Sequence, residues 1–416
     1  MNKDLLKKII YDQHQVIKDA VIVDRDIELE KNVNYVLVGL RRAGKTTMLY
    51  KRVQDLIKEG IEWNQIIYIN FDDERLIDFK LSDFDDILLV AEEMSFKKHY
   101  FYFDEIQNVD DWEKFAIRVA NQGYKVDITG SNAKMLSKEV EAKLGGRYIS
   151  KEILPYSFIE YLRAYNINSS AYSTKEIAIT NNLLEQYFLF GGFPASIDFK
   201  NKREYVSNVY QKVLYGDIIT HNKVRSENGM KLLIKKISES VMQDISYTKL
   251  QNVITGIGYK ISKDVIIDYC GYIKDSFLLF SIENYYASFV DKNSNPKYYF
   301  RDNGVLNLFI DGKKTALLEN IVAINLYRNN NEFYYLKGNK VDIDFYIPYK
   351  NTLIQVAYSL ENQETYDREV NNLVEYAKNT NDELKLFIVT YDEKRTIELE
   401  GKIIEVIPLK EFLINK

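Results

Sequence analysis

The stretch VLVGLRRAGKTTMLY, residues 36–50, limits the fold of this chain more than any other part of it. It opens with an apolar run of the kind that forms a buried strand, and an amphipathic helical pattern begins at Lys45. Gly39, Gly44, Lys45 and Thr46 match the pattern G-x-x-x-x-G-K-[ST] without a gap. The sequence therefore predicts a phosphate-binding loop (P-loop) between a strand and a helix.

The residue types of this loop suit a nucleotide. Glycines admit backbone angles closed to other residues, so successive N–H groups can converge on phosphate oxygens at the positive end of the helix. Lys45 adds a charge for the β- and γ-phosphates, and Thr46 supplies a hydroxyl to Mg²⁺. The alternative is a fortuitous glycine turn before a helix. The expected ATP-binding residues are Gly39, Leu40, Arg41, Arg42, Ala43, Gly44, Lys45, Thr46 and Thr47.

A second signature follows the aromatic run YFYF at residues 100–103, where Asp104 and Glu105 end a predicted central strand. An Asp at the carboxyl edge of a parallel strand can hold Mg²⁺, and a neighbouring Glu can polarise the attacking water. Acidic residues often end strands, so the pair is informative because it follows a P-loop at this distance. We expect Thr46 and Asp104 to bind the metal and Glu105 to be catalytic.

The order of patterns along the chain predicts an α/β protein. Five strands separated by helices, with the P-loop and the acidic pair at strand ends, imply a parallel sheet covered on both faces over residues 35–155. Helix then follows helix to about residue 225, and residues 226–300 read as helices followed by a hairpin. The last hundred residues alternate strand and helix again. Residues 1–34 form a helix and an extended lead-in, which either folds over the nucleotide base or packs as an arm.

Composition narrows the function classes. The net charge of -5 over 416 residues argues against a chain coated in nucleic acid, although it allows one local basic surface. Cys270 is the only cysteine, which excludes a disulfide framework and a thiolate metal site. No apolar run approaches the roughly 18 to 20 residues that span a bilayer, and the N-terminus lacks the apolar core of a signal peptide. We expect a cytoplasmic protein without a membrane segment.

Motifs spread over nearly the whole chain resemble those of a large family of bacterial and archaeal AAA-type ATPases with an uncharacterised nuclease-like C-terminal domain. The motifs are GLRRAGKTT, YINFDDERL, FYFDEIQNVDDWEKF, ITGSN, LGGR before ILPYSFIEYL, LFGGFP, YYFRDNG, LLEN and VDIDF with IQVAYS. The resemblance implies ATP and Mg²⁺ as ligands, ATP hydrolysis, and four domains. These are a P-loop ATPase domain with an N-terminal arm (1–155), a helical lid (156–225), a winged-helix-like domain (226–310) and a restriction-endonuclease-like domain (311–416).

The resemblance also assigns roles to four further residues. Ser131 and Asn132 follow a predicted strand at the place where AAA-type proteins contact the γ-phosphate and the attacking water; an ordinary polar turn is the alternative. Arg147 stands where such proteins carry an arginine finger, which completes the site of a neighbouring copy and implies a homo-oligomer. A salt-bridged surface arginine is the other interpretation. Pro194 resembles the lid proline that packs on adenine, and a plain turn is its alternative.

The C-terminal region departs from the nuclease pattern at one position. Glu319, Asp344 and Gln355 stand where the acidic and amide residues of such a fold belong, but Ala357 occupies the lysine position. A methyl group can neither polarise water nor stabilise charge, so we expect no nuclease activity. The exception would be a relocated lysine such as Lys337 or Lys340.

The sequence thus predicts an ATPase that couples its nucleotide state to a DNA-associated C-terminal region. The alternative is a nucleotide-gated protein-binding switch or scaffold, because lysines and aspartates nearly cancel along the winged-helix-like segment. Binding that weakens steeply with salt would favour DNA. A small-molecule kinase is a third interpretation, and the Glu105 beside Asp104 argues against it, since it indicates an activated water.

Overall fold

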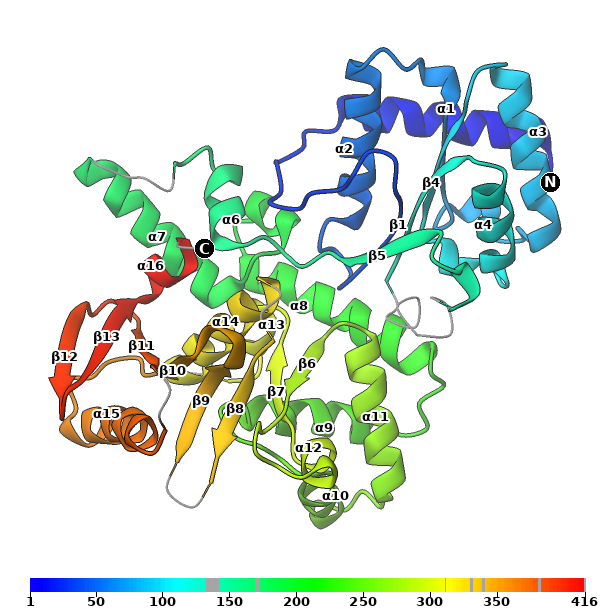
Figure 1. Cartoon of the computed structure of the whole chain (residues 1–416). Helices are drawn as coiled ribbons and strands as arrows, with labels where there is room; N and C mark the ends of the chain where they lie inside the picture. The colour runs from blue at the N-terminus through cyan, green and yellow to red at the C-terminus, as the bar shows by residue number, and fades with distance from the viewer. Residues whose placement is uncertain are drawn as a thin grey trace. The chain divides into compact units, whose positions relative to one another are not determined.

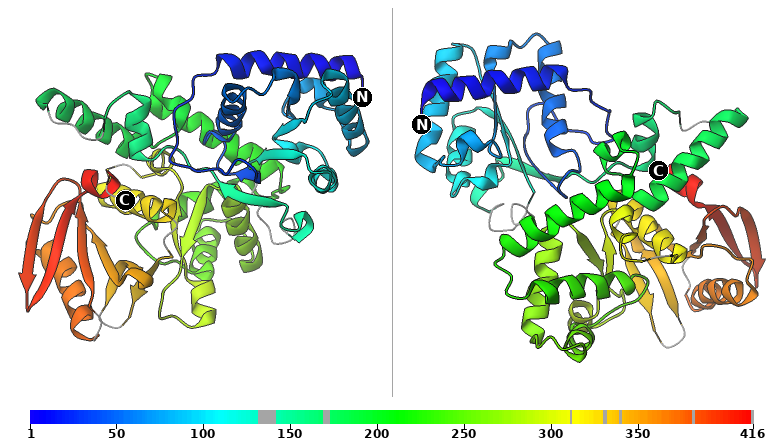
Figure 2. Two further views of the ribbon diagram at one scale, coloured as in Figure 1. Left: turned by 45° about the horizontal axis from the view of Figure 1, so that its top comes forward. Right: turned by 180° about the vertical axis from the view of Figure 1, so that it is seen from behind.

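The computed structural model describes residues 1–131, 142–168, 173–310, 312–329, 332–338, 341–380 and 383–414. The chain divides into two compact units, one of residues 1–154 with 275–277 and one holding the remainder. Each unit has β-sheet of its own: one sheet in the first unit and two in the second (Figures 1 and 2). Within the described ranges, no helix is both long enough and apolar enough to cross a membrane.

The first unit is built on a five-stranded sheet that is parallel, as predicted, and has the order β2-β3-β4-β1-β5. Figure 1 labels β1, β4 and β5 of this sheet. The helices of this unit lie outside the sheet, and α1 packs along β2, α2 and α3. The strands are β1 (Asn34–Val38), β2 (Ile66–Asn70), β3 (Tyr100–Asp104), β4 (Lys125–Gly130) and β5 (Tyr148–Glu152). The helices are α1 (Lys3–Asp19), α2 (Lys45–Lys58), α3 (Phe84–Met94) and α4 (Trp112–Asn121).

Because β1, β3 and β4 are buried at almost every position, their near-continuous apolar runs suit a parallel sheet covered on both faces. All strands point the same way, so the residues after β1, β3 and β4 gather at one edge. Strand β2 ends at Asn70, and Asp73 then caps a turn by accepting from the N–H of Arg75. This sheet edge positions the candidate site.

The second unit begins with helices that lead into three helices and a two-stranded antiparallel sheet. The leading helices are α6 (Phe158–Ala164), α7 (Thr174–Phe190), α8 (Lys202–Lys212) and a π-helical segment η7 (Val213–Thr220). The middle group is α9 (Glu227–Glu239), α10 (Tyr247–Gly256), α11 (Lys263–Asp275), β6 (Leu279–Ile282), α12 (Phe289–Ser294) and β7 (Lys297–Phe300), followed by α13 (Asn303–Leu306).

The last part of this unit is a mixed six-stranded sheet with the order β12-β13-β11-β10-β9-β8 (Figure 1). Helix α15 packs on β9, β10 and β13, while α14 contacts β10. Every position of β10 is buried, so both faces of the sheet are covered there. The elements are α14 (Lys314–Arg328), β8 (Tyr334–Lys337), β9 (Asp342–Ile347), β10 (Thr352–Val356), α15 (Gln363–Lys378), β11 (Lys385–Thr390), β12 (Arg395–Leu399), β13 (Lys402–Pro408) and α16 (Leu409–Ile414).

Two sequence motifs of the second unit, LFGGFP and YYFRDNG, are joined by hydrogen bonds. The N–H of Gly192 donates to the Asp302 carboxylate (2.8 Å), and the Asn303 amide donates to the carbonyl of Phe188 (2.6 Å). Gly191 has φ +74°, and a Cβ there would lie 2.1 Å from an Asp302 oxygen. Gly191 is therefore required by the buried Asp302 carboxylate, whereas a Cβ at Gly192 would lie 2.3 Å from the carbonyl oxygen of Tyr156.

Candidate functional site

The loop between β1 and α2 has the backbone conformation that its glycines permit. Gly39 and Gly44 have φ of +140° and +103°, and Arg42 also lies in the left-handed region at +66°. A Cβ on Gly39 would lie 2.2 Å from the carbonyl oxygen of Ile153, whose own N–H donates to Val38 (2.7 Å). Only glycine fits against this strand extension, which closes one side of the loop.

Lys45 is 4% exposed and reaches back across the loop. Its ammonium group donates to the carbonyls of Gly39 (3.0 Å) and Leu40 (3.3 Å). These main-chain bonds hold the charge at the mouth of the loop, where phosphate oxygens can replace the carbonyls as acceptors. The lead-in reaches the same loop, because Arg25 donates to the carbonyls of Ala43 (3.2 Å) and Leu154 (2.7 Å).

The predicted metal ligands meet at the end of β3. The Thr46 hydroxyl hydrogen-bonds to the buried Asp104 carboxylate, which also accepts from Tyr68 (2.9 Å) and from Thr129. Burial raises the pKa of Asp104, the Glu105 carboxylate beside it acts in the same direction, and the three hydroxyls act in the opposite one. A hydroxyl and a carboxylate that converge from α2 and β3 fit Mg²⁺, which prefers oxygen ligands and keeps several waters.

Glu105 stands in the left-handed backbone region (φ +51°) and is 9% exposed. Its N–H donates to the Thr129 hydroxyl (3.0 Å), and its carboxylate accepts from the side-chain amide of Gln107 (2.6 Å). The same amide lies 3.5 Å from the Ser131 hydroxyl. The structure thus brings Ser131 next to Glu105 through a residue that the sequence analysis did not single out.

The remaining predicted residues lie in different surroundings. Leu40 and Ala43 are buried parts of the loop, and Arg41 approaches Asp72 at 3.9 Å. Asn132 lies outside the described residues. Arg147 is exposed, and its partners in the described part of the chain are the Asn121 side chain and the carbonyls of its own turn. Pro194 starts a 3-10 turn (Pro194–Asp198) of the second unit, so its contact with a base stays a prediction.

Sequence analysis missed Tyr68 and Gln107 as site residues. In the register of the parallel sheet, Asn70 lies opposite Asp104, so Tyr68, two positions before Asn70, lies on the same face of the sheet as Asp104. Strand register could have revealed Tyr68. Gln107 sits in the one-turn helix η4 (Ile106–Asn108), and no periodic pattern marks it.

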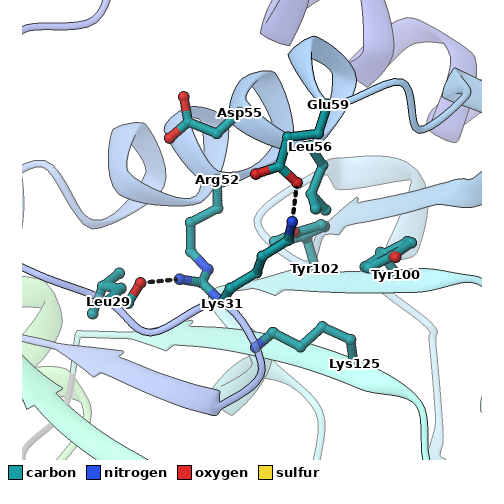
Figure 3. A pocket seen from close by; sticks show the side chains of 9 residues that line it. All are labelled: Leu29, Lys31, Arg52, Asp55, Leu56, Glu59, Tyr100, Tyr102 and Lys125. Atoms are coloured by element: carbon teal, nitrogen blue, oxygen red, sulfur yellow. Dashed lines mark hydrogen bonds and ion pairs between the residues drawn. The ribbon is translucent and has the colours of Figure 1, made fainter.

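A pocket of about 160 Å³ lies at the opposite edge of the same sheet, near the start of β3 and β4 (Figure 3). Arg52 donates to the carbonyl of Leu29 (3.2 Å) and Lys31 pairs with Glu59 across it. Behind it, the buried Asp127 accepts from Arg52 (2.6 Å) and Lys125 (2.7 Å). Because phosphate binds at the carboxyl edge of a parallel sheet, this pocket is not the nucleotide site.

A second cluster of charges lies in the second unit, around the predicted nuclease-like residues. The ammonium group of Lys297, at the start of β7, lies 3.4 Å from Asp344 and 3.7 Å from Glu319. Tyr299 donates to Glu319 (2.7 Å). Burial is the main cause that raises the pKa of Glu319 to about 8 and that of Glu369 to about 7.

Among the described residues, the lysine that pairs with Asp344 and Glu319 is Lys297 and not Lys337. Lys337 is half-exposed and pairs with Asp244, and Lys340 lies outside the described residues. Gln355 accepts from the N–H of Asp344 (2.8 Å), and Ala357 is buried in the core beneath α15. Lys297 lies in a strand outside the nuclease-like pattern, so no sequence motif indicated its place beside these carboxylates.

A cavity of about 670 Å³ borders this cluster and is lined in part by Asp342, Asp344, Gln355 and Glu369. Lys297 and Glu319 are 2% and 0% exposed and are not among its lining residues. Within the described ranges, no three His, Cys, Asp or Glu side chains are placed to hold a metal ion.

Comparison with known proteins covers the whole chain. Residues 31–162 match the model of a family described as an AAA domain, and residues 181–315 match a domain of unknown function. An uncharacterised protein of Methanocaldococcus jannaschii is 34% identical, with 99% of this chain and 96% of that protein covered. One of Haemophilus influenzae is 30% identical, with 91% and 94% covered. A Walker-type ATPase of Pyrococcus abyssi of known structure is 14% identical, with 73% and 94% covered and a TM-score of 0.41.

Proposed function

Because this chain belongs to the AAA-type P-loop ATPases, we propose that it binds ATP with Mg²⁺ at the loop between β1 and α2 and hydrolyses the γ-phosphate bond. The observation that carries the proposal is the meeting of Thr46, Asp104 and Glu105 beside that loop. A phosphate loop alone would support binding. A carboxylate next to the metal ligands supports activation of water, and so hydrolysis.

Each residue then has a defined task. Lys45 exchanges the carbonyls of Gly39 and Leu40 for phosphate oxygens, and the loop N–H groups hold the remaining phosphate charge. Thr46 and Asp104 hold Mg²⁺, which neutralises charge on the phosphate oxygens. Glu105 accepts a proton from the water that attacks the γ-phosphorus, and the bridging oxygen leaves with ADP.

We propose that Ser131 and Asn132 contact the γ-phosphate and that Arg147 completes the site of a neighbouring copy. The exposure of Arg147 supports the second role, because an arginine finger must reach another subunit. We expect the turnover per subunit of the wild type to rise with protein concentration. The turnover of Arg147→Ala should stay low at every concentration. Wild-type turnover in the variant would contradict the role.

The test of ATP hydrolysis compares wild type with Lys45→Ala and Glu105→Gln. We expect Lys45→Ala to lose ATP binding and Glu105→Gln to bind ATP but to hydrolyse it about 10² to 10⁴ times more slowly. A fluorescent ATP analogue measures binding, and phosphate release measures turnover. A Glu105→Gln variant with unchanged turnover would reject Glu105 as the base and would favour phosphoryl transfer to a small molecule.

We also propose that the nucleotide state controls how the second unit holds a macromolecule. The order of α9, α10, α11, β6 and β7 is that of a winged helix, which supports DNA. One observation favours a protein partner instead, because Asp264, Ile267 and Asp268 are exposed on α11, the helix that would enter a major groove. Carboxylates on that helix would repel phosphate. The salt dependence of binding to duplex DNA distinguishes the two partners.

We propose that the charged cluster of the second unit does not cleave nucleic acid. The burial of Lys297 and Glu319 supports this, since a catalytic lysine and a metal-binding carboxylate must reach the substrate. Incubation of the protein with duplex and single-stranded DNA, in Mg²⁺ and in Mn²⁺, should leave both intact. Cleavage that Asp344→Asn abolishes would overturn the proposal.

A further inference from the structure

Gln107, at the catalytic edge, has one buried polar atom that lacks a partner among the described residues. Its amide nitrogen donates to Glu105 (2.6 Å), while its amide oxygen is buried and accepts no hydrogen bond from the residues that the structure describes. The reverse orientation of the amide is excluded, because it would place an oxygen against the Glu105 carboxylate. A buried acceptor left without a donor costs about 1 to 3 kcal/mol.

The chain can hold Gln107 in this position because of the turn that carries it. Glu105 leaves β3 in the left-handed region, and η4 starts immediately afterwards, which returns the side chain of Gln107 toward Glu105. The amide nitrogen also lies 3.5 Å from Ser131 at the end of β4. Gln107 therefore spans the two strand ends between which the γ-phosphate is proposed to lie.

We propose that Gln107 is a positioning residue for hydrolysis, with its N–H fixing the Glu105 carboxylate and its carbonyl oxygen accepting a hydrogen of the attacking water. The inference rests on the proposed ATPase function. A water has two O–H groups, so one is directed to Glu105, which takes the proton, and the other to Gln107. Attack on phosphorus forms the new P–O bond as the bridging oxygen leaves with ADP.

This role predicts that loss of Gln107 lowers kcat without weakening the binding of ATP. ATP is held by the P-loop, to which Gln107 makes no hydrogen bond in the described part of the chain, whereas the water is aligned only when Glu105 and Gln107 are both in place. Loss of one preorganised hydrogen bond in an active site typically lowers kcat by about 10² to 10³, so we expect a loss of about 10²-fold without Gln107. The KM for ATP should change by no more than about two-fold.

The experiment measures steady-state ATP hydrolysis by wild type, Gln107→Met, Gln107→Asn and Glu105→Gln. Gln107→Met keeps the length of the side chain without its hydrogen bonds and should lose about 10² in kcat. Gln107→Asn keeps the amide on a shorter stem and should recover part of that loss. Gln65→Met is the matched control, because the Gln65 amide donates to the Lys98 carbonyl at the far edge of the sheet.

Affinity for a fluorescent ATP analogue and the unfolding temperature are measured for each variant, so that lost turnover is not confused with lost binding or folding. Gln107→Met with kcat within two-fold of wild type would overturn the inference and leave the ATPase standing. A lower kcat that is matched by weaker binding of the analogue would overturn it as well. A wild-type protein without turnover, or with turnover indifferent to Glu105→Gln, would instead overturn the proposed function.

Discussion

The backbone N–H of Gly192 donates to the Asp302 carboxylate over 2.8 Å and so joins two stretches that lie 110 residues apart in the chain. The same carboxylate accepts from the N–H groups of Gly304 (2.9 Å) and Val305 (3.2 Å). It caps α13 and holds the end of α7 with one buried side chain. Because these N–H groups have been removed from water, each depends on this acceptor.

Replacement of Asp302 by Ala should therefore destabilise the second unit by about 2 to 5 kcal/mol, since it leaves buried donors unpaired. Urea unfolding measures the loss. Asp268→Ala, an exposed aspartate of α11, is the control and should change stability by less than about 0.5 kcal/mol. Equal effects of the two replacements would contradict the role of Asp302.

Asp127 should contribute as much to the stability of the first unit as Asp302 does to that of the second. It is fully buried and accepts from Arg52, from Lys125 and from the N–H of Tyr35. Asp127→Ala leaves two cations without their counter-ion and should cost about 3 to 5 kcal/mol. Asp55, which pairs with lysines on the surface of α2, provides the control, and Asp55→Ala should cost less than about 1 kcal/mol.

Lys297→Met tests the charge balance of the second unit. It keeps much of the side-chain volume but leaves Glu319 and Asp344 without the ammonium group between them, so a loss of about 3 to 5 kcal/mol is expected. Lys337→Met removes a half-exposed ammonium group that pairs with Asp244 and should have little effect. Thermal unfolding of both variants shows whether the buried ion cluster around Lys297 is needed for the stability of the second unit.

The same cluster predicts a pH dependence. The pKa values of Glu319 and Glu369 are raised from 4.5 to about 8 and about 7, chiefly by burial. Between pH 4.5 and about 8 the folded protein therefore binds more protons than the unfolded chain, and its stability falls as pH rises through that window. The unfolding temperature of the second unit should therefore drop between pH 4.5 and about pH 8. Glu319→Gln should make the drop shallower, and an unchanged drop would reject the assignment.

Local patterns predicted the first unit best. The start of α2 at Lys45 and the end of β3 at Asp104 followed from a glycine loop and an apolar run, which depend on neighbouring residues alone. The AAA-type family assignment followed from motifs of the same kind. In contrast, Gln107 acts through a contact across two strand ends, and Lys297 through contacts with α14 and β9. Such side chains become visible only when the tertiary structure brings distant segments together.

The close packing of Gly39 against Ile153 limits how the phosphate-binding loop can move. Because Gly39 lies so close to the carbonyl of Ile153, a change in the shape of this loop around a nucleotide would have to move Ile153 as well. Ile153 precedes Pro155, the first residue of the second unit, by two positions. We propose that a shift of this loop on release of the γ-phosphate passes first to Ile153 and so to the segment that leads into the second unit.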